Sequence, residues 1–166
     1  MRMRAALLLS LVLQVSTSGF ATAQSPATDL TGTWVVNLAK SNFGTLPPPT
    51  VDSFTVTRAG ATYQFDATTD VGGQGKQHIM YKWPVGAGEA TNDMANGATV
   101  HTTVKLKGDT MVVASEIKMQ SQTVALQTGR VFRSPDGKSL TREVEIQPVA
   151  GPSTDPIRLL FVYDKR

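Results

Sequence analysis

The sequence predicts an all-β fold, an antiparallel meander β-barrel of about eight to nine strands. Beyond Asn37, no segment has the apolar period of an amphipathic helix. Apolar side chains instead recur at every second position in short runs, which is the period of a strand with one buried face. Clusters of Gly, Pro, Asp, Asn and Ser separate these runs and predict tight turns between neighbouring antiparallel strands.

The predicted strands follow one another along the chain, and each is recognised by apolar residues that share one face. In chain order these faces hold Trp34, Val36 and Leu38; Phe54 and Val56; Tyr63, Phe65 and Ala67; Ile79, Tyr81 and Trp83; Val100, Val104 and Leu106; and Met111, Val113, Ile117 and Met119. Further strands are expected at 123–133, 139–147 and 157–163. Glu116 and Lys118 fall on the opposite face of their strand, which is expected to meet solvent.

The turn sequences agree with consecutive hairpins. In "SPDGKS", Pro135 fixes φ for a type I turn and Gly137 takes the left-handed position that starts a bulged hairpin. In "LKGDTM", Gly108 suits the first central position of a two-residue hairpin loop. Residues 84–97 and 148–156 are polar or rich in small residues and are expected to be loops. The "GTLPPPT" stretch is expected to be an extended strap after the first strand.

Residues 1–23 have the three-part layout of a secretory signal peptide. Two arginines precede an apolar run that ends at Val15, and small residues at positions 21 and 23 favour cleavage before Gln24. Polar residues interrupt the run, whereas a membrane anchor needs about 20 continuous apolar residues. We therefore expect residues 24–166 to form a single exported domain, periplasmic or extracellular.

Composition narrows the classes of partner. The net charge of +3 falls by two when the leader arginines are lost, and no basic run or basic-aromatic stripe remains. Neither a nucleic-acid partner nor a membrane span is therefore expected. The chain has no cysteine, so an exported domain of this sequence must obtain its stability from its core rather than from disulfides.

The segments "GTWVVNLAKSNFG", "RVFRSPDGKSLT" and "VYDKR" resemble a group of small exported bacterial proteins described as lipocalin-like, most of them uncharacterised. In lipocalins and their calycin relatives, a Gly-x-Trp opens the first barrel strand and the Trp closes the barrel floor. Gly32 and Trp34 match that motif. The resemblance implies a basic residue packed on Trp34, for which Arg158, Lys165 and Arg166 are the candidates.

The opening segment also resembles the biotin-binding avidins, whose first strand begins with the same Gly-x-Trp. That resemblance would place Asn37, Ser41 and Asn42 near the urea group of biotin. The spacing differs by one residue, and a shift of one residue turns every side chain of a strand to its other face. An avidin-like biotin binder is therefore a minor alternative.

Few residues are equipped for catalysis or metal binding. The two histidines, His78 and His101, fall opposite the apolar faces of their strands, and neither has the close partner that metal sites use. With no cysteine and no paired inward carboxylates, we expect no metal, no cofactor and no enzymatic activity.

Two arginines form the one constellation that indicates a ligand. If the "SPDG" hairpin is extended, Phe132 faces Leu140 and Arg130 faces Arg142, with both arginines on the interior face. Like charges directly opposite one another are unfavourable, and buried charges need a partner. Such a pair would hold an anion, for instance a carboxylate head group.

Three simpler outcomes for the arginine pair stay open. A bulge at Gly137 would shift the register, Glu143 or Glu145 could pair with one arginine, and the guanidinium groups could extend to the barrel rim.

The sequence therefore supports two hypotheses about function. In the first, the protein binds a small hydrophobic or amphipathic molecule, including an anionic one, inside the barrel. The predicted ligand-binding residues are Arg130, Arg142, Tyr63, Phe65, Tyr81, Trp83, Met111 and Met119. In the second, those side chains fill the barrel, and the protein is a structural or interaction protein of the cell envelope with a protein partner.

Overall fold

The computed structural model describes residues 28–73, 75–94, 96–149, 151 and 154–166. The predicted signal peptide lies outside the described residues. The elements are β1 (Gly32–Val36), η2 (Leu38–Lys40), β2 (Pro49–Ala59), β3 (Thr62–Val71), β4 (Gln77–Pro84), β5 (Ala90–Asp93), β6 (Ala98–Lys107), β7 (Thr110–Met119), β8 (Gln122–Arg133), β9 (Ser139–Pro148) and β10 (Ile157–Lys165).

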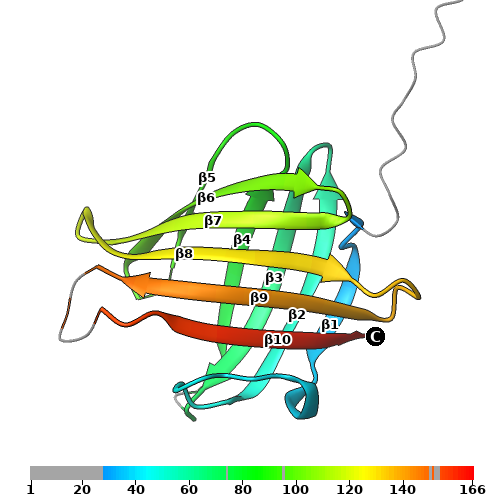
Figure 1. The fold of residues 1–166 in the computed structure, drawn as a ribbon, viewed down its shortest axis with the longest axis horizontal. Helices are drawn as coiled ribbons and strands as arrows, with labels where there is room; N and C mark the ends of the chain where they lie inside the picture. The colour runs from blue at the N-terminus through cyan, green and yellow to red at the C-terminus, as the bar shows by residue number, and fades with distance from the viewer. Residues whose placement is uncertain (1–27, 74, 95, 150, 152–153) are drawn as a thin grey trace, which may run out of the picture.

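All ten strands belong to one antiparallel sheet in the order β4-β3-β2-β1-β10-β9-β8-β7-β6-β5. The last strand lies between β1 and β9, so the meander curls back on its own beginning. Strands β6 to β10 cross in front of the steeply running β1 to β4 (Figure 1). The prediction of an all-β antiparallel barrel is confirmed, with ten strands instead of eight to nine.

The tenth strand comes from a segment that was expected to be a loop. Within residues 84–97 the chain forms β5, which pairs with β6. Strands β4 and β5 are the two ends of the sheet, and the Asn92 side chain joins them. Its Oδ1 accepts a hydrogen bond from the Lys82 backbone N–H at 2.7 Å, and its Nδ2 donates to the Lys82 carbonyl at 3.1 Å. The barrel is thereby nearly closed.

Residues 37–48 connect β1 to β2 along the lower edge of the barrel in Figure 1. Leu38 was expected on the first strand, but it begins the short helix η2 and is 49% exposed. The three residues that suggested an avidin site hold this connection in place. Asn37 Nδ2 donates to Asp164 at 2.7 Å, Ser41 accepts from the Val162 N–H at 2.9 Å, and Asn42 pairs with Leu160.

At one end of the barrel, Trp34 is 0% exposed and donates from its indole N–H to the Leu30 carbonyl at 2.8 Å; we call this the packed end. Trp34 is therefore part of the buried core. Lys165, one of the three predicted basic partners, lies 5.4 Å from the ring centroid. Arg133, which the sequence did not suggest, lies over the same ring at 5.9 Å and donates to the Asp29 carbonyl.

The predicted register of the β8–β9 hairpin is wrong by one residue. The turn closes with Ser134 N–H donating to the Ser139 carbonyl, and Gly137 has the expected positive φ of 70°. This loop holds one residue more than the extrapolation assumed, so Arg130 pairs with Glu143 rather than with Arg142. Because side chains alternate along a strand, the shift places Arg130 and Arg142 on opposite faces.

Candidate ligand-binding site

The half of the barrel opposite the packed end contains two adjoining cavities. The first, of about 230 Å³, lies under residues 43–49, and we call it the strap chamber. The second, of about 330 Å³, lies beside the junction of β4 and β5, and we call it the seam chamber. Ile79, Tyr81 and Arg142 line both chambers and form the partition between them.

The two chambers differ in the chemistry of their walls. Rings and aliphatic side chains dominate the strap chamber, namely Phe43, Leu46, Pro47, Pro49, Phe54, Ala67, Val71, Leu159 and Phe161, together with Asp52, Thr69 and Tyr163. Amide and hydroxyl side chains are more frequent in the seam chamber, which is lined by Trp83, Asn92, Met94, Asn96, Ala98, Val100, Thr102, Ser115, Ile117 and Gln127.

Arg142 projects from β9 into the partition. Its guanidinium lies 5.5 Å from the centre of the Trp83 ring and acts on the nearby Tyr81 hydroxyl through its positive charge. Among the described residues, no carboxylate forms an ion pair with Arg142, whereas the outward Arg130 and Arg158 pair with Glu143 and Glu145. The partition therefore presents a cationic donor beside a ring and a phenol and outside ion-pair contact with the described carboxylates, which is an arrangement open to an anion.

A carboxyl group also lines the strap chamber. Asp52 accepts a hydrogen bond from the Tyr163 hydroxyl at 2.9 Å. Burial raises the pKa of Asp52 above its ordinary value and outweighs the opposite effects of the Tyr163 hydrogen bond and of the charge on Arg142. Burial and the nearby Asp52 charge also raise the pKa of Tyr163 well above its usual range.

Tyr81 is suited to donate a hydrogen bond at neutral pH. Burial raises the pKa of its hydroxyl to about 12, despite the opposing charge of Arg142. A protonated phenol carries one donor hydrogen, which Tyr81 can offer to an acceptor in either chamber. Arg142 and Tyr81 together can therefore offer donors to one anionic group.

Stacked rings hold this pair in position. Phe65 lies parallel to Tyr81 with ring centroids 4.5 Å apart, and it contacts the tilted Trp83 ring at 4.6 Å. Such contacts restrict the side-chain rotamers of Tyr81 and Trp83 at the chamber walls. Phe65 lines neither chamber, so its position is that of a support behind the two rings that do.

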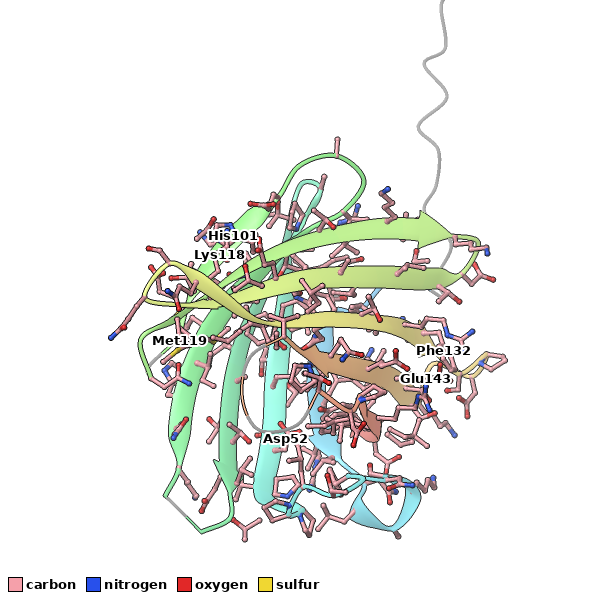
Figure 2. All side chains as sticks on the ribbon, turned by 60° about the vertical axis from the view of Figure 1, so that its left-hand side comes forward. Asp52, His101, Lys118, Met119, Phe132 and Glu143 are labelled. Carbon is pink, nitrogen blue, oxygen red and sulfur yellow. The ribbon has the colours of Figure 1, made fainter. Side chains whose placement is uncertain are left out.

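The remaining predicted site residues lie elsewhere. Tyr63 and Met111 are 0% exposed within the hydrophobic core and line neither chamber. Met119 lies at the end of β7 and is 37% exposed (Figure 2). Arg130 is on the outer face, 62% exposed, with its ion pair to Glu143 at 2.5 Å. Of the two predicted arginines, only Arg142 faces the interior.

A hollow of about 490 Å³ on the outer face of β7 to β10 is larger than either chamber. Its lining includes Arg130, Glu143, Glu145 and Arg158, which already form two ion pairs with one another. These cations have carboxylate partners in an exposed setting, where ion pairs contribute little stability. The interior chambers, which combine apolar walls with an inward cation, are the stronger candidate site.

Both histidines lie on the outer face, as their position in the sequence indicated. His78 Nε2 lies 2.5 Å from Asp66 Oδ1, and His101 Nδ1 lies 2.8 Å from Glu89 Oε1. Within the described ranges, no three His, Cys, Asp or Glu side chains are grouped so that they could hold a metal ion. The same part of the chain contains no helix with the length and apolar character to cross a bilayer.

Sequence reasoning missed Asp52, Tyr163 and Asn92. Asp52 alternates with Phe54 and Val56, so a carboxyl on an otherwise apolar strand face was a usable signal. Tyr163 likewise alternates with Leu159 and Phe161 in the last strand. The sequence around Asn92 contains no such signal. The Asn92 side chain joins β5 to β4 at the two ends of the sheet, and strand alternation does not show that these two strands meet.

No protein-family model matches the chain, and no curated protein matches it. Solved structures with a similar fold include the REP1-NXSQ fatty acid transporter, at 13% identity over 84% of this chain and 98% of that one, with a TM-score of 0.54. Fatty-acid-binding protein 1 of Echinococcus granulosus has 11% identity over 82% and 96%, with a TM-score of 0.55. The wild-type fluorescent protein UnaG has 14% identity over 82% and 97%, with a TM-score of 0.53. At these identities the comparison shows a shared calycin-like barrel fold.

Proposed function

We propose that the protein is an exported binding protein for a small amphipathic molecule with an acidic group. The observation that carries this proposal is the inward guanidinium of Arg142, which borders both chambers and has no ion pair among the described residues. The acidic group of the ligand would meet Arg142 and Tyr81, and its apolar part would lie in the strap chamber.

Two further observations support an apolar ligand. The strap chamber is lined mainly by aromatic and aliphatic side chains, which is typical of sites that bury most of a ligand's surface. Two of the similar structures are described as a fatty acid transporter and a fatty-acid-binding protein. Export rests on the signal-peptide pattern of residues 1–23.

Native mass spectrometry provides the direct test. The protein is exported through its own leader, purified without delipidation and measured under non-denaturing conditions. We expect an adduct of defined mass that disappears after extraction with organic solvent. A protein that carries no adduct, and that also fails to bind fatty acids added at millimolar concentration, would contradict the proposal and favour a filled-barrel interaction protein.

A pair of arginine variants tests the role of the partition. Arg142→Met removes the inward charge while keeping a long side chain, and Arg130→Met makes the same change on the outer face. Loss of a hydrogen bond to a charged group costs about 1.5–3 kcal/mol, so we expect Arg142→Met to weaken decanoate binding about 10- to 100-fold. Arg130→Met should bind as the wild type does. Calorimetric titration measures both affinities.

The same titration distinguishes loss of the Arg142 charge from a general disturbance of the fold. Arg142→Met leaves the Asp52 carboxyl without its nearby cation, so the double variant Asp52→Asn/Arg142→Met serves as an electrically neutral check. Equal affinities for decanoate in the wild type and in the folded double variant would contradict a role of Arg142 in anion binding.

A further inference from the structure

The sizes of the two chambers limit what each can hold alone. Ligand pockets for small molecules occupy roughly 300–1,000 Å³. The strap chamber, at about 230 Å³, is smaller than this range, and the seam chamber, at about 330 Å³, is at its lower limit. A ligand of ordinary size therefore needs both chambers and must extend past the partition formed by Ile79, Tyr81 and Arg142.

The seam chamber has polar groups with unused hydrogen-bonding capacity. Gln127 lines this chamber, and within the described residues its side chain makes no hydrogen bond. Thr102 and Ser115 share a buried hydrogen bond at 3.0 Å, which uses only one of their two hydroxyl hydrogens. The Asn92 amide, in contrast, is occupied by the Lys82 backbone. Free amide and hydroxyl groups in a cavity are suited to a neutral ligand group that hydrogen-bonds.

The chamber walls present three kinds of chemical group in a fixed order along the barrel interior. An apolar space comes first, under residues 43–49. The Arg142 guanidinium and the Tyr81 hydroxyl follow at the partition, and the amide and hydroxyl groups come last. A simple fatty acid would match the first two regions and leave the groups of the third without a ligand partner.

We propose that the preferred ligand is an acyl conjugate of the N-acyl amino acid class, an inference that rests on the proposed function. Its acyl chain occupies the strap chamber, and its carboxylate binds Arg142 and Tyr81 at the partition. The polar side chain of the amino acid extends past the partition into the seam chamber, where Gln127 and the Thr102–Ser115 pair bind it.

Two probes with the same acyl chain and a single carboxylate test the proposal. Decanoate and N-decanoylglutamine are titrated calorimetrically into the delipidated protein. One or two additional hydrogen bonds correspond to an affinity gain of about tenfold. We therefore expect N-decanoylglutamine to bind about tenfold more tightly than decanoate.

Two variants locate the additional affinity. Gln127→Met removes the amide with little change in size, and we expect it to reduce the preference for the conjugate several-fold while leaving decanoate binding unchanged. Ala98→Leu adds bulk to the seam chamber alone and should weaken only the conjugate. Ala67→Leu adds the same bulk to the strap chamber alone and should weaken both probes.

The outcomes distinguish this inference from the proposed function. If the wild type binds both probes equally and Ala98→Leu changes neither affinity, the seam chamber does not hold the ligand and the inference is overturned, while the proposed function stands. If neither probe binds to the wild type, the proposed function itself fails.

Discussion

Asp52 and Arg142 give the barrel interior one acidic and one basic group. The two carry opposite charges, but Asp52 is held by the Tyr163 hydroxyl rather than by an ion pair. A charged Asp52 would repel an anionic ligand, and its raised pKa reduces the free energy needed to protonate it. Binding of an anion next to Arg142 would therefore favour uptake of a proton by Asp52.

The pKa of Asp52 also predicts how stability depends on pH. Because burial raises this pKa above the ordinary 3.8, the folded protein keeps the proton at pH values where the unfolded chain has lost it. The free energy of unfolding is therefore lowered as the pH rises from 3.8 through the folded-state pKa. Asp52→Asn should remove this component, since asparagine keeps the acceptor for Tyr163 and cannot ionise in this range.

Urea unfolding between about pH 4 and 7 measures the effect as the difference between wild type and variant at each pH. Asp109→Asn, in the exposed β6–β7 turn, is the matched control and should follow the wild type. A pH profile of Asp52→Asn that runs parallel to the wild type would show that the Asp52 carboxyl titrates as if it were exposed.

At the scale of elements, a side chain joins the two ends of the sheet at the seam between β4 and β5. The Asn92 amide makes the pair of hydrogen bonds to Lys82 that a neighbouring strand's backbone would make. Nearby, Val85 and Val104 form an isolated parallel bridge. Unpaired strand edges invite association with other chains, so this closure also protects the edge of β4.

We predict that Asn92→Ala opens the seam. The substitution removes both hydrogen bonds to Lys82, and loss of a partner for a buried polar group costs about 1–3 kcal/mol. Amide hydrogen exchange at Lys82 should become faster by about tenfold or more, while exchange in β7 and β8 stays as in the wild type. Thr91→Ala, which changes the neighbouring residue of β5, is the control. Similar exchange at Lys82 in both variants would mean that other contacts hold β4 to β5.

The alternation of apolar and polar residues predicted most strands. The register between paired strands depends instead on the number of residues in each hairpin loop, which alternation does not show. In the β6–β7 hairpin, Gly108 and Asp109 form the expected two-residue loop between Lys107 and Thr110, and Gly108 has a φ of 59°. In the β8–β9 hairpin, one additional loop residue reversed the faces of Arg130 and Phe132 relative to Arg142. A type I turn followed by glycine fits more than one loop length, so the sequence left this open.

At the scale of the whole molecule, the barrel is half filled. The packed end around Trp34 and Tyr63 corresponds to the filled-barrel hypothesis, and the two chambers correspond to the binding hypothesis. The apolar period predicted which side chains face the barrel interior. Whether a cavity forms depends on how the inward side chains of many strands pack together at the same level along the barrel axis. Tyr63 and Tyr81 illustrate this, because both face inward and only Tyr81 reaches a chamber.

A half-filled barrel that binds a ligand should depend on that ligand for part of its stability. A ligand that binds only the folded state at 100 times its dissociation constant stabilises it by about 2.7 kcal/mol. For a chain of this length, the thermal midpoint should rise by about 5–10 °C when decanoate is added to the delipidated protein. Calorimetry with Arg130→Met should show the same rise, and Arg142→Met at the same decanoate concentration should show a smaller one. If the midpoint does not move with ligand in the wild type, the chambers are packing defects of a barrel that is stable without a ligand, and its outer face becomes the surface on which to seek a partner.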